Sequence, residues 1–234
     1  HLLRDQSLKP IQDPLEMNET LPNVVSKLSS TQTYKDQFKR AFGSEEITPE
    51  KMSLAMEQFM NSIVSVESKY DRFLRGDEAL NASEERGRRL YFAEYNQFFP
   101  DSSGADCAHC HGGRNFENDR YMNNGLNALA DQTDIGREEV TTRPMDKAKF
   151  KVPSLRNVEV TAPYMHDGEF KTLEEVVDHY DSGLHPSPTL DPALENTRGT
   201  GLLLDSQDKS DLIAFLKTLT DDVLLTNPEY SDPN

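Results

Sequence analysis

The sequence has 234 residues, enough for one large domain or for a medium domain with a helical extension. Its 25 basic and 41 acidic residues give a formal net charge of -16, which argues against nucleic acid as a partner because a polyanion repels an acidic surface. No run approaches the roughly 18 apolar residues that a membrane-spanning helix needs, so we expect no membrane span.

The first clear helical signal begins at Thr48, a capping residue that is followed by Pro49 at the first helical position. From there apolar residues recur at steps of three and four, which predicts one continuous helix of about six turns with a single buried stripe. The stripe consists of Met52, Ala55, Met56, Phe59, Ile63, Val66 and Tyr70.

Three further helices are predicted from signals at their N-termini. Asn81 with Glu84, and Thr172 with Glu175, have the spacing of a capping box, and another helix begins at residue 205 or 206. The expected inner faces are Gly87, Leu90 and Tyr91 in the first of these helices, Leu173, Val176, Val177 and Tyr180 in the second, and Leu212, Phe215, Leu216 and Leu219 in the third.

Two long irregular segments separate these helices, residues 100–156 and 183–201. Both are rich in Gly, Pro, Asn and Asp, and loops of this length are unusual in a compact domain unless they wrap a large cofactor. No strand-like alternation persists beyond a few residues, and no internal repeat is evident. The predicted fold class is all-α.

The only two cysteines, Cys107 and Cys110, are three residues apart and are followed at once by His111. In a C-x-x-C-H motif each thiol forms a thioether with one haem vinyl group, and the short turn brings the imidazole to the iron. The sequence therefore predicts one covalent haem c with His111 as an axial ligand. A hydrophobic content of only 35% fits a domain whose interior is partly filled by such a cofactor.

Three other interpretations of the cysteine pair are weaker. A thioredoxin-like redox pair needs a βαβ setting, which this sequence lacks. A disulfide across two intervening residues is strained and leaves His111 unexplained. A zinc site needs a second Cys or His pair at a suitable spacing, and His109 is expected to be a solvent-facing spacer.

The second axial ligand is not fixed by the pattern alone. Helix phase places Tyr180 on an apolar face and His179 on the solvent side, yet an ordinary core tyrosine explains the same periodicity. Met165 is an alternative as a thioether ligand, although methionine often simply fills gaps in cores. The residues considered are Met122, Met145, Met165, His166, His179 and Tyr180.

Nearly the whole chain resembles the later part of the bacterial dihaem cytochrome c peroxidases and their relatives of the MauG type. The resemblance is carried by short segments that follow one another in the family's order. Besides the haem motif they are PIQDPLEM at 10–17, SKYDRF at 68–73, NNGL at 123–126, KVPSLRN at 151–157 and TAPYMHDG at 161–168.

The resemblance implies two cytochrome c-like domains, a first with a peroxide-reactive haem and a second with an electron-transfer haem, with Ca2+ between them. This chain matches the second domain and the linker, and it has no first C-x-x-C-H motif. We therefore expect a helical linker region at residues 1–80, which is the remnant of the N-terminal half. A cytochrome c-like haem domain at 81–225 and a tail at 226–234 are expected to follow.

The resemblance also implies axial ligands. The family takes the second ligand of the electron-transfer iron from the position fourteen residues after the histidine of the His-Asp-Gly motif, which here is Tyr180, counted from His166. Peroxidases have methionine at that position and MauG-like members have tyrosine. An anionic phenolate favours Fe(III) over Fe(II) and lowers the reduction potential.

Four further site residues follow from the same resemblance. The carbonyls of Thr161 and Pro163 would bind calcium, and Arg156 would pair with a haem propionate. Glu16 corresponds to the acid above the peroxide-reactive haem, although that haem belongs to the domain that this chain lacks.

The expected function is electron transfer to a second haem domain that reduces hydrogen peroxide to water, with electrons from a small donor protein, a cytochrome c or a cupredoxin. One alternative is a MauG-like oxidase that uses high-valent iron and a Tyr-ligated haem to oxidise a protein or organic substrate. Another is a monohaem electron carrier without catalysis. Covalent haem attachment implies maturation in the periplasm.

Overall fold

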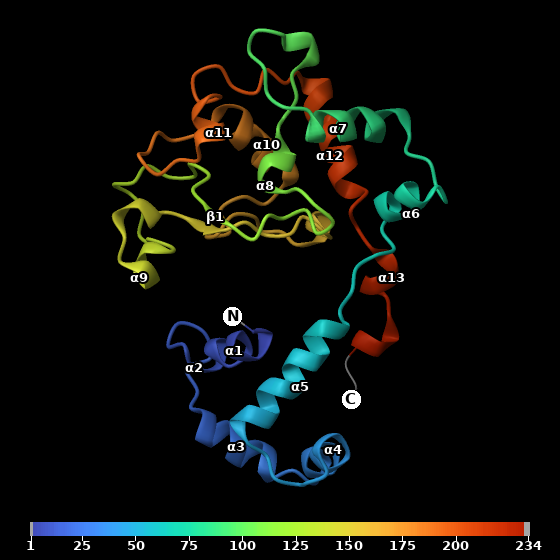
Figure 1. The fold of residues 1–234 in the computed structure, drawn as a ribbon, viewed down its shortest axis with the longest axis vertical. Coiled ribbons are helices and arrows are strands. Elements are labelled where there is room, and N and C mark those ends of the chain that lie inside the picture. The colour runs from blue at the N-terminus through green and yellow to red at the C-terminus, as the bar shows by residue number, and fades with distance from the viewer. Residues whose placement is uncertain (1, 232–234) are drawn as a thin grey trace. The chain divides into compact units, whose positions relative to one another are not determined.

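The computed structural model describes residues 2–231 and divides into two compact units between Val64 and Ser65. We refer to them as the first unit and the second unit, and each is considered by itself (Figure 1). The second unit begins at Ser65, before the boundary near residue 80 that we expected. Within residues 2–231, no helix combines the length and the apolar character needed to cross a membrane.

Over residues 2–64, the first unit has five helices around a small apolar core. Phe38, Ile47 and Met52 are buried at its centre, and residues of α3 and α4 pack around them. Thr48 caps α5 as predicted, and its hydroxyl accepts a hydrogen bond from the Lys51 N–H at 3.2 Å. The helices are α1 Leu3–Ser7, α2 Lys9–Gln12, α3 Leu21–Ser29, α4 Gln32–Phe42 and α5 Pro49–Ser62.

The prediction of one long helix from residue 48 to residue 70 is wrong, because the structure has two helices there. Helix α5 ends at Ser62, and α6 Lys69–Arg75 begins after Ser68. A capping box starts the second helix, since the Ser68 hydroxyl accepts from the Asp71 N–H at 3.2 Å and the Asp71 carboxylate accepts from the Ser68 N–H at 3.1 Å. Of the predicted stripe, only Met52 and Tyr70 are buried.

The core of the second unit is built where α7 Ala82–Phe92 crosses α12 Ser206–Lys217 (Figure 1). Both helices begin as predicted, with Asn81 and Asp205 accepting hydrogen bonds from the first turn. Gly87 makes the close crossing possible, because a Cβ at this position would lie 1.8 Å from the Asp211 carbonyl oxygen. Aromatic rings fill the space beside the crossing, and Tyr91 and Phe215 are completely buried there.

The remaining elements confirm an all-α fold with long connections. Helix α10 Leu173–Ser182 begins at the predicted Thr172 and Glu175 capping box. The two long irregular segments carry only short elements, including one small antiparallel sheet in which Tyr121 pairs with Lys151. These short elements are α8 Cys107–Cys110, β1 Tyr121–Met122, α9 Glu138–Thr141, β2 Phe150–Lys151 and α11 Pro192–Glu195, and α13 Asp222–Leu225 lies near the end of the chain.

Candidate haem-binding site

The two cysteines lie at the ends of α8, a single helical turn that the chain enters through Asp106 in a left-handed conformation (φ 50). Main-chain hydrogen bonds fix this entry against α7. The Ala105 N–H donates to the Leu90 carbonyl at 2.8 Å, and the Asp106 N–H donates to the Ala93 carbonyl at 3.0 Å. The motif is therefore held at the C-terminal end of α7, one of the two helices that cross in the core.

Both thiols are free, and both cysteines are half-buried. Burial raises the pKa of Cys107 and that of Cys110 to about 12, so both sulfurs are protonated at neutral pH. A reactive redox pair instead needs a lowered thiol pKa. Among residues 2–231, no group of three or more His, Cys, Asp or Glu side chains is placed to hold a metal ion. His109 is exposed, as predicted for a spacer.

The His111 ring is oriented by backbone carbonyls. Its Nδ1 lies 3.0 Å from the Pro153 carbonyl oxygen and 3.3 Å from that of Phe116, so Nδ1 carries the proton and Nε2 keeps its lone pair. An axial histidine needs this tautomer, with Nδ1–H given to a carbonyl and Nε2 given to the metal. Burial lowers the pKa of His111, which favours the neutral ring that a metal requires. The buried Tyr91 hydroxyl donates to the His111 carbonyl at 2.6 Å.

Helix α10 contributes Tyr180, which packs against the same core cluster as Cys107. Burial raises the pKa of Tyr180 to about 12, and the nearby Asn124 side chain opposes this rise. Both cysteines are close enough to affect the same pKa, so the phenol lies near the haem-attachment motif. The structure thus brings Tyr180 and the C-x-x-C-H motif together.

The placement of His179 on the solvent side was wrong. His179 is buried, and its Nε2 lies 3.0 Å from the Asn124 carbonyl oxygen. Helix phase assigned it to solvent together with Glu174, Glu175 and Asp178, which are indeed exposed. The phase of one helix does not reveal that the distant turn at residues 123–126 covers part of that side.

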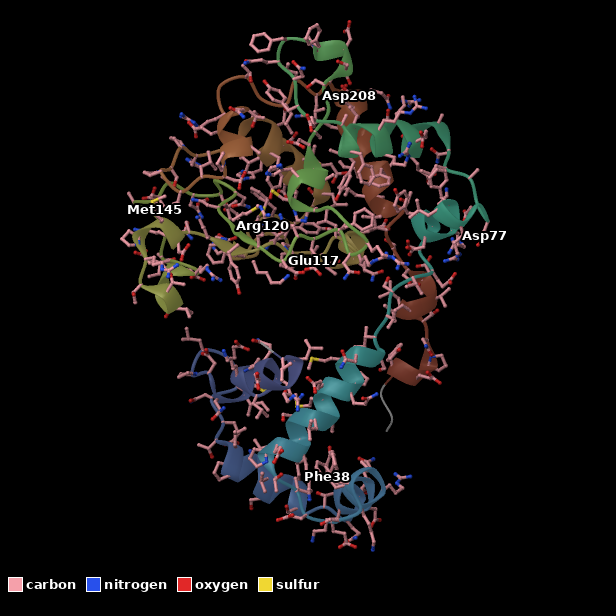
Figure 2. The ribbon with its side chains drawn as sticks, viewed as in Figure 1. Phe38, Asp77, Glu117, Arg120, Met145 and Asp208 are labelled. Carbon is pink, nitrogen blue, oxygen red and sulfur yellow. The ribbon has the colours of Figure 1, made fainter. Side chains whose placement is uncertain are left out.

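The other residues considered as ligands fall into two groups. Met165 accepts a hydrogen bond from the Asn124 side-chain amide at 3.2 Å, and the Met122 sulfur lies 3.3 Å from the Cys110 sulfur, so both are near the site. Met145 lies at the periphery beside α9 and is 61% exposed (Figure 2). His166 is exposed and stacks on the Phe150 ring at a centroid distance of 3.8 Å.

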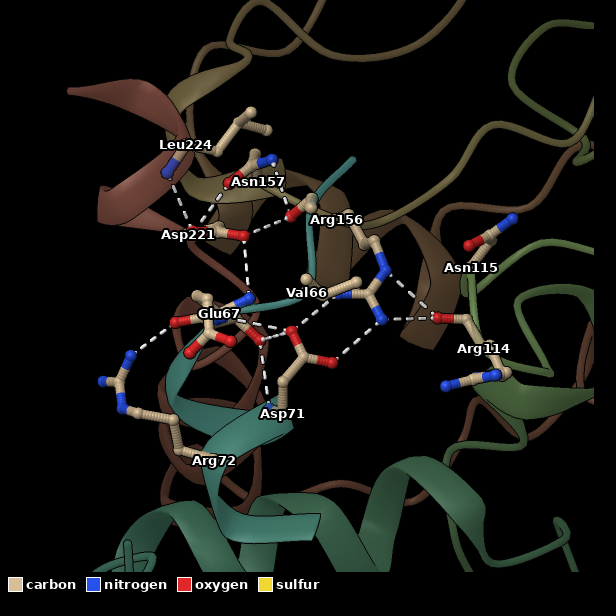
Figure 3. A network of polar contacts seen from close by, with 12 residues as sticks. Val66, Glu67, Asp71, Arg72, Arg114, Asn115, Arg156, Asn157, Asp221 and Leu224 are labelled. Carbon is tan, nitrogen blue, oxygen red and sulfur yellow. Dashed lines mark hydrogen bonds and ion pairs between the residues drawn. The ribbon is translucent and has the colours of Figure 1, made fainter. Parts of the chain in front are cut away.

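Arg156 belongs to a polar network that connects α6 with two loops of the second unit (Figure 3). Its guanidinium forms a bidentate pair with the Asp71 carboxylate at 2.8 and 3.0 Å, and it also donates to the Arg114 carbonyl at 2.7 Å. The guanidinium carbon lies 5.8 Å from the centre of the Phe116 ring. The structure thus gives Arg156 a protein partner, and its pairing with a propionate stays a prediction.

The remaining predicted site residues lie at exposed positions. Thr161 precedes the cis Ala162–Pro163 peptide bond and Pro163 forms part of it, in the turn that follows the 3-10 helix Val158–Val160. Glu16 is exposed and belongs to the first unit. Calcium binding and a catalytic role for Glu16 stay predictions.

The residues present fit a c-type haem. Two free thiols stand on one helical turn, the next residue offers a neutral imidazole with Nε2 available, and a phenol on α10 lies nearby. Sequence reasoning missed Asn124, which donates to the Met165 sulfur and lies near Tyr180. The sequence feature that could have revealed it is the NNGL segment, which supported only the resemblance to the family.

Comparisons with known proteins show what the chain is similar to. A family model described as di-haem cytochrome c peroxidase matches residues 1–79. The crystal structure of a MauG-like protein associated with microbial copper homeostasis superposes with a TM-score of 0.82 at 34% identity, covering 99% of this chain and 72% of that one.

Two curated relatives are matched over most of this chain. The cytochrome c551 peroxidase of Nitrosomonas europaea is 34% identical over 99% of this chain and 61% of its own length. The methylamine utilization protein MauG of Methylorubrum extorquens is 34% identical over 93% of this chain and 58% of its own length. The chain therefore spans about three fifths of the length of these relatives.

Proposed function

Because this chain belongs to the family of dihaem cytochrome c peroxidases and MauG proteins, we propose that it carries the electron-transfer haem of an enzyme that reduces hydrogen peroxide. The observation that carries the proposal is the arrangement of His111. Its ring presents Nε2 while Nδ1 is held by the Pro153 carbonyl, beside two free thiols on one helical turn. Such an arrangement suits a permanently attached metal group and does not suit a reactive thiol pair.

When bound, the haem supplies a one-electron couple between Fe(III) and Fe(II). The chain's own residues do the rest of the work that electron transfer requires. The two thiols anchor the group, the Pro153 carbonyl and the Tyr91 hydroxyl fix the orientation of the His111 segment, and the aromatic core around Phe215 excludes water. A rigid site of this kind keeps structural change small when the charge of the group changes.

In the intact protein we infer that electrons pass through this haem to a second haem domain, where H2O2, two electrons and two protons give two waters. A net charge of -16 supports a basic donor protein, because an acidic surface accelerates its encounter at low ionic strength. A small cytochrome c or a cupredoxin fits this role. Thioether formation requires reduced thiols and haem in one compartment, which supports the periplasm as the site of assembly.

Tyr180 favours a second candidate function, that of a MauG-like oxidase. A phenolate ligand stabilises the higher oxidation states of iron, which suits the withdrawal of electrons from an organic or protein substrate. The proximity of Tyr180 to both cysteines supports this ligation. A carrier without catalysis is the third possibility that the experiment must separate, because this chain holds a single C-x-x-C-H motif.

Three finer assignments belong to the same proposal. The carbonyls of Thr161 and Pro163 bind Ca2+, a hard cation that prefers oxygen ligands. Arg156 stands beside a haem propionate while it keeps its pair with Asp71. Glu16 acts at the peroxide-reactive haem of the intact protein, where a carboxylate would move a proton between the two peroxide oxygens.

Tyr180→Phe in the haem-loaded chain is the test of the axial ligand. We expect the ferric low-spin spectrum to change and the reduction potential to rise, because the anionic oxygen ligand is lost. Tyr164→Phe is the matched control, since Tyr164 packs against the same cluster but donates to the Val158 carbonyl at 2.9 Å. An unchanged spectrum in Tyr180→Phe would exclude the ligation.

The mass and the haem content of the protein test the rest of the proposal. We expect one haem per chain that survives denaturation, because thioether bonds are covalent. Rapid peroxide consumption by the intact enzyme, with a donor protein present, supports the peroxidase, whereas peroxide-driven oxidation of an organic substrate supports the oxidase. A colourless chain with the mass of the bare polypeptide would overturn all three functions.

A further inference from the structure

Asn124 lies in a turn whose position is tightly fixed. Its Oδ1 accepts a hydrogen bond from the Leu126 N–H at 3.3 Å, and the preceding Asn123 accepts from the Gly125 N–H at 2.8 Å. The turn is also joined to α10, because His179 Nε2 lies 3.0 Å from the Asn124 carbonyl oxygen. Two successive asparagine turns and a buried histidine therefore leave the Asn124 side chain little freedom.

The side chain of Asn124 lies beside both residues that compete as the second axial ligand. Its Nδ2 donates to the Met165 sulfur at 3.2 Å, and the same side chain is near enough to Tyr180 to lower the pKa of the phenol. A primary amide has two N–H donors and one oxygen. With the oxygen given to Leu126, one N–H is available for each of the two ligand candidates.

We propose that Asn124 is a positioning residue that selects Tyr180 over Met165 as the second axial ligand of the haem. The inference rests on the proposed function, since it needs a haem held by His111. An N–H directed at the phenol oxygen fixes the tyrosine ring in one orientation. The other N–H donates to the Met165 sulfur and so holds this thioether against the turn at residues 123–126.

The two contacts act in the same direction. A ligand held in its binding orientation loses less rotamer entropy when the metal binds, whereas a competitor held by a hydrogen bond must first break it. Outer-shell partners of this kind commonly change metal-ligand affinity by about 10–100-fold. The hydrogen bonds of one amide are therefore strong enough to decide which of the two side chains binds the iron.

The test compares Asn124→Ser with the wild-type haem-loaded chain by electron paramagnetic resonance and by potentiometry. Serine keeps an oxygen that can accept from the Leu126 N–H, but it has neither amide donor. We expect the single tyrosinate-type ferric signal to be replaced by a mixture, with the methionine-to-iron charge-transfer band present and the reduction potential raised. In the double variant Asn124→Ser, Met165→Leu, that band should be absent.

A matched control is available in the same domain. The amide of Asn118 contacts the sulfur of another methionine, Met122, at 3.8 Å and the His109 carbonyl at 3.4 Å. Asn118→Ser removes an amide near the haem motif and should leave the ferric signal unchanged. If Asn124→Ser does not fold, Asn124→Asp keeps the oxygen acceptor and removes both donors, and the ligand set is then read from the resonance spectrum alone.

The outcomes separate this inference from the proposed function. A wild-type signal and potential in Asn124→Ser, together with an altered Tyr180→Phe, would overturn the role of Asn124 and leave the tyrosine ligation standing. An unchanged Tyr180→Phe would overturn both. A mixture in Asn124→Ser that includes the methionine band, with Asn118→Ser unaffected, supports the selection.

Discussion

Tyr91 is completely buried, and its hydroxyl is the donor to the main-chain carbonyl of His111 at 2.6 Å. Tyr91→Phe keeps the ring in the aromatic core but leaves that carbonyl without this donor. We expect unfolding to become easier by about 1–2 kcal/mol, the usual cost of an unsatisfied buried acceptor. Chemical denaturation of the haem-loaded chain measures this.

Tyr95→Phe is the control for that experiment. The Tyr95 hydroxyl is bonded to the Thr200 hydroxyl near the surface, where water can replace the lost partner. We expect a change below about 0.5 kcal/mol. Equal losses of unfolding free energy in Tyr91→Phe and Tyr95→Phe would mean that the hydrogen bond to the His111 carbonyl stabilises the fold no more than a surface hydrogen bond does.

At this scale the sequence predicts residues whose chemistry is local and misses those that act across the fold. The C-x-x-C-H spacing was sufficient to predict Cys107, Cys110 and His111 as haem-binding residues, because the thioether chemistry itself requires this spacing. It could not indicate that Pro153 would supply the carbonyl for His111, since the partner comes from a distant loop. The role that we propose for Asn124 was hidden for the same reason.

The crossing of α7 and α12 depends on one glycine. A Cβ added to Gly87 would lie 1.8 Å from the Asp211 carbonyl oxygen and 2.4 Å from its carbon, and these backbone atoms cannot move without shifting α12. Alanine in an exposed helix interior is normally more stable than glycine by about 0.5–1 kcal/mol. We expect Gly87→Ala to lower the free energy of unfolding instead, by about 3 kcal/mol or more.

Thermal unfolding of the haem-loaded variant tests this, with Gly199→Ala as the control. A Cβ at Gly199 meets nothing within 4 Å, so the melting temperature should stay near that of the wild type. A Gly87→Ala variant with a wild-type melting temperature would show that the crossing can relax, and the glycine would then have no packing role.

Helix starts were predictable where a capping residue stands before an apolar stripe, and helix ends were not. The starts of α5, α7, α10 and α12 were all predicted, whereas the end of α5 at Ser62 was not. Periodicity continued through the break because residues 63 and 66 happen to keep the apolar spacing. The start of α3 carried the same signal as that of α5, a threonine cap at Thr20 with Pro22 in the first turn, and it was not used.

At the scale of the whole molecule, two buried carboxylates and one largely buried carboxylate hold the second unit together despite the overall negative charge. Asp71 pairs with Arg156, Asp211 pairs with Arg86, and Asp221 accepts from the Glu67 N–H at 2.9 Å. Burial raises the pKa of each carboxyl, but hydrogen bonds from these partners outweigh it, so all three values are lowered. The unfolded chain therefore binds more protons in acid than the folded one.

The pair of Asp71 and Arg156 is suited to testing this pH dependence of stability, because both side chains are largely buried at 14% exposure or less. A lowered folded pKa means that the pair stabilises fully above the ordinary pKa of 3.8, and that this contribution is lost as the pH falls through the folded value. We expect Asp71→Asn to lose roughly 2–4 kcal/mol near neutral pH, since Arg156 is left without its charge partner. The difference from the wild type should shrink steadily below about pH 4.

Asp77→Asn is the matched control, because Asp77 pairs with Arg75 at the surface, where the two side chains are 58% and 42% exposed (Figure 2). An exposed pair contributes about 0–1 kcal/mol, so this variant should follow the wild type at every pH. Denaturant unfolding of the haem-loaded proteins between pH 3 and pH 7 compares the three. A constant difference for Asp71→Asn across that range would mean that the carboxylate acts through packing alone, because a loss of charge pairing must disappear once the wild-type carboxyl is protonated.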